Sequence, residues 1–333
     1  MELIELCALS APPGFEQNAA EHIHMLIKPY MTETWIDTLG NVIGVRKCGK
    51  EQVAKLLFDA HIDEPGMIIT GSEDGFLRFA ALGGVDARSL PASEVLILTD
   101  PPTYGVIAAM PPHLTKKEDA DKFAKIEDML IDIGRAESDV PIGTPAVFTH
   151  GARVIDNMIF GKALDNRAGV FAVLRALELL RDVELHCDLY VMFSVQEEVG
   201  TRGAGTGAFA IEPDYCVVID AGHAKTPDSK PSEVQTELGK GVIISRGPNM
   251  NRAFTERVVK LAVTGEVAHQ IDVEPGGNSG TNARVIQTTC MGISTALLSI
   301  PIRYMHCSHE VASLDDIDSA VKLLCGIAKE CGQ

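Results

Sequence analysis

The run Val191-Met192-Phe193-Ser194-Val195-Gln196-Glu197-Glu198-Val199-Gly200 joins an apolar, β-prone segment to two adjacent carboxylates. A buried strand of this kind delivers its last side chains into a cleft at the edge of a sheet. Two acids side by side in a buried place are costly unless positive charge lies close to them. The stretch therefore predicts a metal site, with one carboxylate as a ligand and its neighbour free to move protons.

The chain around this strand alternates between helical and extended patterns. Apolar residues at helical spacing predict helices near the N-terminus, up to residue 27 with a break at 11–14, and over 168–180, 254–264 and 313–328. Short apolar runs predict strands over 32–36, 42–45, 54–60, 189–195, 216–219 and 297–300. This order predicts an α/β fold with a mixed sheet flanked by helices.

The sequence pattern changes between residues 67 and 156, where short β-prone runs are separated by glycine and proline. These runs lie at 76–79, 94–98, 104–107, 128–134 and 146–149. Closely spaced short strands are typical of a small β-barrel or sandwich. We therefore expect an α/β catalytic domain made of residues 1–66 and 157–333, with a β-rich domain of residues 67–156 inserted into it.

The amino-acid composition limits the kinds of molecule that the protein is expected to bind. The 333 residues hold 29 basic and 46 acidic side chains, a net charge of −17, which argues against nucleic acid or an anionic membrane as the main partner. No apolar run approaches the roughly 20 residues of a membrane span, and no secretory signal is recognisable. The eight cysteines form no CxxC pair, so reduced, buried thiols and a cytoplasmic location are expected.

Acids and histidines collect where the predicted strands end. Ligands bind at the carboxyl ends of strands in open α/β sheets, so these side chains are expected to converge. The set is His61, Asp63, Asp165, Glu197, Glu198, Asp220 and His306. Each is a weak signal alone, since Asp165 could cap a helix and Asp220 could begin a turn. Their occurrence together at five separate places favours a metal site.

The types of these residues indicate the chemistry. Two histidines and three carboxylates suit Zn²⁺ or Co²⁺, with Mn²⁺ as a further choice, better than a cysteine-rich structural zinc site. Five ligands are enough for two ions that share a carboxylate, with a water between them made acidic. The remaining glutamate of the pair could act as general base. Asp63, two residues after His61, could orient the imidazole.

At these residues the chain resembles the M42 metallo-aminopeptidases, the family of the glutamyl and tetrahedral (TET) aminopeptidases. The resemblance covers nearly the whole length. The motifs that carry it are 37–41 (DTLGN), 60–64 (AHIDE), 81–85 (ALGGV), 111–114 (PPHL), 163–167 (ALDNR), 196–200 (QEEVG) and 303–306 (RYMH).

The resemblance implies a role for each residue of the set. His61 and Asp220 would hold one metal ion, Glu198 and His306 the other, and Asp165 would bridge them. Glu197 would be the general base and Asp63 would steer His61. The resemblance also implies that the insert is a PDZ-like dimerisation domain, and that the homodimers can build a hollow tetrahedral dodecamer.

Two positions depart from the family's commonest pattern. Asn282 stands where aspartate is frequent, which places one charge fewer near the expected rim of the substrate site. His309 competes with His306 as a ligand, although the family register favours His306.

The sequence thus predicts a dimetal aminopeptidase that removes the N-terminal residue of short peptides. A dimetal deacylase of N-acyl amino acids or sugars is an alternative within the same chemistry. A glycosidase would need two carboxylates free to flank a sugar, and these carboxylates are committed to metal. A non-catalytic assembly scaffold is an alternative of a different class, and the presence of Glu197 argues against it.

Overall fold

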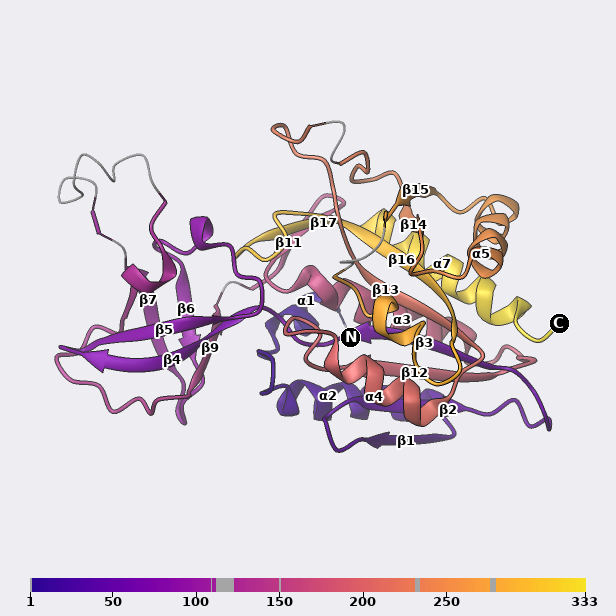
Figure 1. Cartoon of the computed structure of the whole chain (residues 1–333), viewed down its shortest axis with the longest axis horizontal. Coiled ribbons are helices and arrows are strands. Elements are labelled where there is room, and N and C mark those ends of the chain that lie inside the picture. The colour runs from indigo at the N-terminus through magenta and orange to yellow at the C-terminus, as the bar shows by residue number, and fades with distance from the viewer. Residues whose placement is uncertain (1, 109, 112–122, 150, 231–233, 276–279) are drawn as a thin grey trace.

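The computed structural model describes residues 2–108, 110–111, 123–149, 151–230, 234–275 and 280–333, and these form two lobes (Figure 1). The helices are α1 (Leu3–Ala8), α2 (Gln17–Ile27), α3 (Leu164–Leu180), α4 (Arg202–Ile211), α5 (Arg252–Thr264), α6 (Ala283–Ile286) and α7 (Leu314–Glu330), with short 3-10 turns at Lys28–Tyr30, Ala87–Ser89 and Ile126–Asp128. The strands of the large lobe are β1 (Glu33–Ile36), β2 (Val42–Arg46), β3 (Lys55–His61), β10 (Arg153–Ile155), β11 (Met158–Gly161), β12 (Asp188–Ser194), β13 (Tyr215–His223), β14 (Val242–Arg246), β15 (His269–Val273), β16 (Ser294–Arg303) and β17 (Glu310–Ser313).

The large lobe is built on one mixed sheet. In the described residues its eleven strands follow the order β1-β2-β12-β3-β13-β16-β17-β11-β10, with β14 paired to β16 and β15 to β14. The central strands β12, β3, β13 and β16 are mutually parallel, whereas β17 runs antiparallel to β16, and β11 runs antiparallel to β17. The carboxyl ends of the four parallel strands therefore lie at one edge of the sheet.

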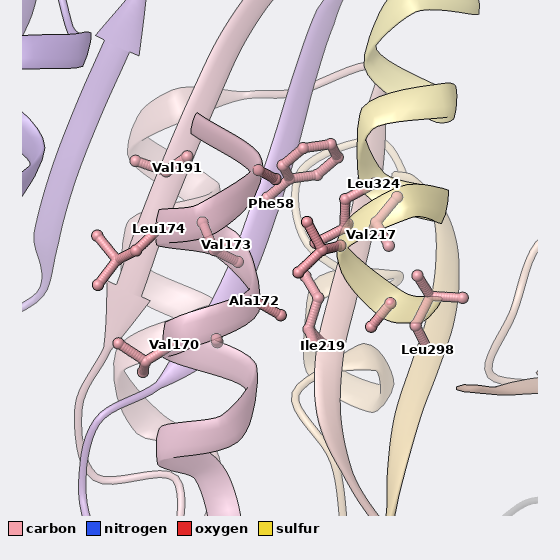
Figure 2. Packing of buried hydrophobic residues seen from close by; sticks show 14 of the residues in the cluster. Phe58, Val170, Ala172, Val173, Leu174, Val191, Val217, Ile219, Leu298 and Leu324 are labelled. Carbon is pink, nitrogen blue, oxygen red and sulfur yellow. The ribbon is translucent and has the colours of Figure 1, made fainter. Parts of the chain in front are cut away.

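Alternation along the central strands gives the sheet two apolar faces. Phe58 of β3 packs in a cluster with α3 and α7, while its neighbour Leu57 faces the opposite side with α4 and α6. Figure 2 shows Phe58 and Val217 of the sheet beside side chains of α3 and α7. Because successive residues of a strand point to opposite faces, these continuous apolar runs are buried by helices on both sides.

The small lobe is a closed barrel, at the left in Figure 1. Its strands, in the order β4-β5-β8-β7-β6-β9, are β4 (Gly66–Glu73), β5 (Phe76–Leu82), β6 (Glu94–Ile97), β7 (Thr103–Ala108), β8 (Leu130–Asp132) and β9 (Pro145–Phe148). Inward-facing residues such as Ile69, Leu77 and Ile131 form its own core. The barrel leaves the large lobe directly after β3 and returns to it through β10, which pairs with β11 in the large sheet.

The predicted fold class is confirmed: a mixed sheet flanked by helices carries an inserted small barrel. The domain boundaries at 66/67 and 156/157 stay a prediction, as does the role of the motif at 112–114, which lies outside the described residues. Helix α4 and strands β14 and β15 were not predicted. No helix in the described part of the chain is long and apolar enough to cross a membrane.

The expectation of buried thiols is wrong for one cysteine. All eight cysteines lie in described segments and are free, but Cys290 is exposed in the turn after α6. Cys48 and Cys307 are half-buried, and the other five are buried.

Candidate metal centre

Four parallel strands bring their ligand candidates to the same edge of the sheet. His61 is the last residue of β3, and Asp220 lies in the final half of β13. Glu197 and Glu198 follow the end of β12, and His306 follows the end of β16. The sequence prediction that these side chains converge is correct in the structure, because parallel pairing aligns the carboxyl ends.

Asp165 lies between the two histidines. Its Oδ1 is 3.1 Å from Nε2 of His61, and its Oδ2 is 3.4 Å from Nε2 of His306. Asp220 Oδ1 lies 3.4 Å from His61 Nε2, and Glu198 Oε1 lies 3.5 Å from His306 Nε2. One carboxylate thus faces both imidazoles, and each imidazole has a second carboxylate of its own.

Asp63 organises the neighbouring turn as well as His61. The Nδ1 atom of His61 lies 3.2 Å from the backbone oxygen of Asp63 and 3.5 Å from its Oδ1. The same carboxylate accepts the backbone N–H of Glu197 through Oδ1 and that of Glu198 through Oδ2, each at 3.0 Å. Asp63 therefore orients the imidazole so that Nε2 faces the site, and it also holds the turn that carries both glutamates.

Burial or neighbouring charges raise the pKa values of two glutamates and one histidine of this cluster. Burial raises the pKa of Glu197 to about 9 and that of Glu198 to about 8, with Asp220 acting on Glu197 and Asp165 on Glu198 in the same direction. Burial works against the charged form of His306, yet its hydrogen bond to Asp165 and the charge of Glu198 raise its pKa to about 10. Without bound metal, the carboxylates and histidines of this cluster can therefore lie this close together only if they share protons with one another.

The residues of this cluster are suited to bind divalent metal. Three groups have ligand atoms within 4.8 Å of one another: His61, Asp165 and Asp220; Asp165, Glu198 and His306; and His61, Glu197 and Glu198. Among the described residues, no group forms a hydrogen bond to Oε1 of Glu197 or Oε1 of Glu198, although both atoms are buried. Two imidazoles and three carboxylates make a nitrogen and oxygen donor set that zinc, cobalt and manganese share.

A cavity of about 580 Å³ opens onto this cluster. Residues of β13, β14 and β15 also line the cavity, among them His223, Ile243, Ser245 and Asp272, and so does Arg284 of α6. The dimensions suit a small ligand such as an amino-acid side chain with its attached backbone.

Three supporting groups were not predicted from sequence. Gly84, on the loop after β5, accepts the Nδ1–H of His306 at 2.9 Å, which leaves Nε2 for the site. Glu16 accepts the backbone N–H of Gln196 at 3.0 Å. Glu310 accepts the backbone N–H groups of Asp165 and His306. Gly84 lies in the motif at 81–85 but has no side chain that could indicate a contact, and Glu16 and Glu310 lie in none of the quoted motifs, so the sequence gave no signal for these contacts.

The expected place of Asn282 is wrong. Its side chain is 1% exposed and lies beneath the site, where Nδ2 donates to Asp59 Oδ2 at 2.8 Å and to Ser194 Oγ at 2.9 Å. The asparagine amide thus donates a hydrogen bond to a buried aspartate. An aspartate at position 282 could donate this bond only if it were protonated. His306, rather than His309, joins the ligand cluster.

Comparison with known proteins identifies the family. The model of the family described as M42 glutamyl aminopeptidase matches residues 40–323, which is most of the chain. The chain belongs to the M42 family. A lysyl aminopeptidase of Pyrococcus furiosus is 34% identical over 316 residues, covering 92% of this chain and 89% of the relative.

Solved structures of M42 peptidases superpose on this member over almost its full length. A TET aminopeptidase of the archaeon Thaumarchaeota archaeon SCGC AB-539-E09 matches with a TM-score of 0.93 and 30% identity, covering 98% of this chain and 95% of that one. The TET1 peptidase of Pyrococcus horikoshii, which can assemble into a tetrahedron or a large octahedral shell, matches with a TM-score of 0.84 and 33% identity, covering 99% and 100%. This M42 protein is therefore a metallo-aminopeptidase by family and by fold.

Proposed function

We propose that this M42 member is a dimetal aminopeptidase that removes the N-terminal residue from short peptides. The observation that carries the proposal is the position of Asp165, whose two carboxylate oxygens face the Nε2 atoms of His61 and His306 at 3.1 and 3.4 Å. In this proposal His61 and Asp220 hold one ion, Glu198 and His306 hold the other, and Asp165 is shared. Two divalent ions bound there supply an acidified water and polarise the scissile carbonyl.

Glu197 is the proposed general base. Its side chain is 8% exposed, it lines the cavity, and its Oε1 has no hydrogen-bond partner among the described residues. The carboxylate is thus free to accept a proton from the attacking water and to return it to the departing amine. Asp63 keeps Glu197 in place through the backbone N–H of that residue.

The shape of the site supports the exopeptidase assignment. The ligand cluster lines a cavity of about 580 Å³, a volume within the range of sites that bind small ligands. A substrate held with its N-terminus in this space would place the first peptide bond at Glu197. A deacylase of the same chemistry would accept an acylated amine at that position instead.

The decisive assay compares free and blocked amines. The apoprotein is reloaded with Co²⁺, Zn²⁺ or Mn²⁺ and given a panel of aminoacyl-p-nitroanilides beside their N-acetyl counterparts. We expect cleavage of the free-amine compounds only, and the panel then gives the preferred residue. Cleavage of the N-acetyl set would support the deacylase, and inactivity with two bound ions would support a scaffold.

Glu197→Gln tests the assignment of the base. The substitution keeps the shape of the side chain and removes its capacity to accept a proton, so kcat should fall by at least about a hundredfold with metal content unchanged. Full activity of E197Q would rule out Glu197 as the base.

The inserted barrel is the proposed assembly module. Its described surface exposes apolar side chains, among them Tyr104, Phe123 and Ile142, which are 50%, 74% and 74% exposed. Together with the behaviour of the related TET1 peptidase, this favours a homodimer that builds a tetrahedral dodecamer. Light scattering gives the mass directly, and a stable monomer at micromolar concentration would contradict the proposal.

A further inference from the structure

Glu310 occupies a particular place in the topology. It is the first residue of β17, and β17 lies between β11 and β16 in the sheet. Glu310 is in register with Gly161, the last residue of β11, and the next residue, Val311, is in register with Arg303, the last of β16. The chain that leaves β11 reaches Asp165 four residues later, and the chain that leaves β16 reaches His306 three residues later. A side chain at the start of β17 therefore lies between two ligand-bearing segments.

The carboxylate of Glu310 bonds to both segments. Its Oε2 accepts the backbone N–H of Asp165 at 2.9 Å, and its Oε1 accepts the backbone N–H of His306 at 2.9 Å. The residue is only 1% exposed, so water does not compete for these oxygens. One buried acid thus fixes the backbone at the shared ligand and at a ligand of the second ion.

Both segments have backbone conformations that need such support. His306 has φ of 65° and Tyr304 has φ of 60°, and Ala163, two residues before Asp165, has φ of 57°. L-residues other than glycine rarely adopt this left-handed region, and they keep it only where the surroundings hold them there. Released from Glu310, the two segments would be free to relax away from the geometry that aims Asp165 and His306 at each other.

We propose that Glu310 is a positioning residue that sets the separation of Asp165 and His306 and thereby the affinity of the metal site. The inference rests on the dimetal site proposed above. Glu310 is in none of the ligand groups and does not line the cavity, so it acts through the backbone N–H groups of the two ligands. A partner of this kind is typically worth about ten- to a hundredfold in metal affinity.

Glu310→Gln is the test, because glutamine has the same shape but only one acceptor oxygen. Its NH₂ group would face the N–H of Asp165 or of His306, so one of the two ligand segments loses its bond. Asp316→Asn is the matched control. Asp316 is equally buried and accepts two backbone N–H groups, those of Gly239 at 2.7 Å and Gly241 at 2.6 Å, but it bonds no ligand candidate.

Apoproteins of the wild type and both variants are titrated with Co²⁺, and binding is followed by calorimetry and by the visible d–d absorption of the ion. The wild type should bind two ions. E310Q should bind at least one of them about ten- to a hundredfold more weakly and show an altered spectrum, whereas D316N should lose thermal stability and keep wild-type affinity and spectrum. E310Q with wild-type affinity and spectrum would refute the positioning role.

The titrations distinguish a failure of the dimetal proposal from a failure of the Glu310 proposal. If the wild type binds a single ion, the dimetal proposal fails regardless of Glu310. If E310Q does not fold, Glu310→Asp decides, since it keeps the charge and a carboxylate but is one methylene too short to reach both segments. E310D should weaken Co²⁺ binding, and wild-type binding by E310D would overturn the inference.

Discussion

Gly84 offers a steric test of the ligand arrangement. A Cβ atom added at this position would lie 2.7 Å from Nδ1 and 3.0 Å from Cε1 of His306. Ordinary van der Waals contact begins at 3.4 Å, so Gly84→Ala forces the imidazole or the loop to move by about 0.7 Å. The φ angle of Gly84 is not in the left-handed region, so alanine does not strain the backbone there, and the clash is with the His306 ring.

The expected loss follows from the tolerance of metal coordination. Ligand distances in metal sites vary by only about 0.2 Å, so a displacement of about 0.7 Å is large. We expect the ion held by Glu198 and His306 to bind ten- to a hundredfold more weakly, or about 1.4 to 2.7 kcal/mol. The ion held by His61 and Asp220 should keep its affinity.

Calorimetric titration of the apoprotein with Co²⁺ resolves this difference, because only one of the two binding steps should change. Gly326→Ala is the control, since a Cβ there meets nothing within 4 Å, and alanine in helix α7 should add about 0.5 to 1 kcal/mol of stability. Two unchanged binding steps in G84A, or equal weakening of both, would show that His306 is not a ligand of one ion in particular.

Three further outcomes are expected. The carboxylate of Glu64 lies 2.7 Å from the amine of Lys162, so Lys162→Met leaves a buried acid that is poorly compensated. Urea unfolding of this variant should show a loss of about 3 to 5 kcal/mol in the free energy of unfolding, and the double variant with Glu64→Gln should recover part of the loss. Burial raises the pKa of Glu16 from 4.5 to about 7, so the stability that this group contributes at low pH is lost as the pH rises from about 4.5 to 7. Over this range the metal-free wild type should lose up to about 3.4 kcal/mol relative to E16Q, and a constant difference in urea midpoints would contradict this. Gly203→Ala should lower the melting temperature strongly, because its Cβ would lie 2.2 Å from Asn41 Oδ1 and 2.5 Å from the Val195 oxygen, whereas Gly205→Ala meets only a Val285 methyl at 3.2 Å and should be nearly neutral.

The sequence predicted the meeting of the ligand candidates because direction in a parallel sheet is a strong constraint. His61, Asp220 and the Glu197–Glu198 pair each come at or just beyond the end of an apolar run, and parallel runs end at one edge. The types of these residues then indicated a metal. The pattern alone did not indicate which of the two glutamates faces the histidines. A shift of one residue in the turn would exchange their positions.

Tertiary packing decided what the sequence did not reveal. Helix α4 (RGAGTGAFAI) is rich in glycine and has poor helix propensity, yet it forms because Gly203 and Gly207 let it lie against Asn41 and Met192. Asn282 was expected near the rim of the substrate site on the basis of the family resemblance, but it is buried against Asp59 of β3 and Ser194 of β12. Glu310 gave no signal because its role depends on which strands flank β17, and that order is not visible in a linear pattern.

The order of the ligands along the chain has a consequence for biosynthesis. The proposed ligands begin at His61 and end at His306 of a 333-residue chain, and Glu310 comes later still. A ribosome-bound chain therefore lacks the full set of proposed ligands until residue 306 has been synthesised, and any product that terminates before this residue lacks the set permanently. The proposed centre therefore cannot assemble on a nascent chain before β16 and the loop that follows it have been made.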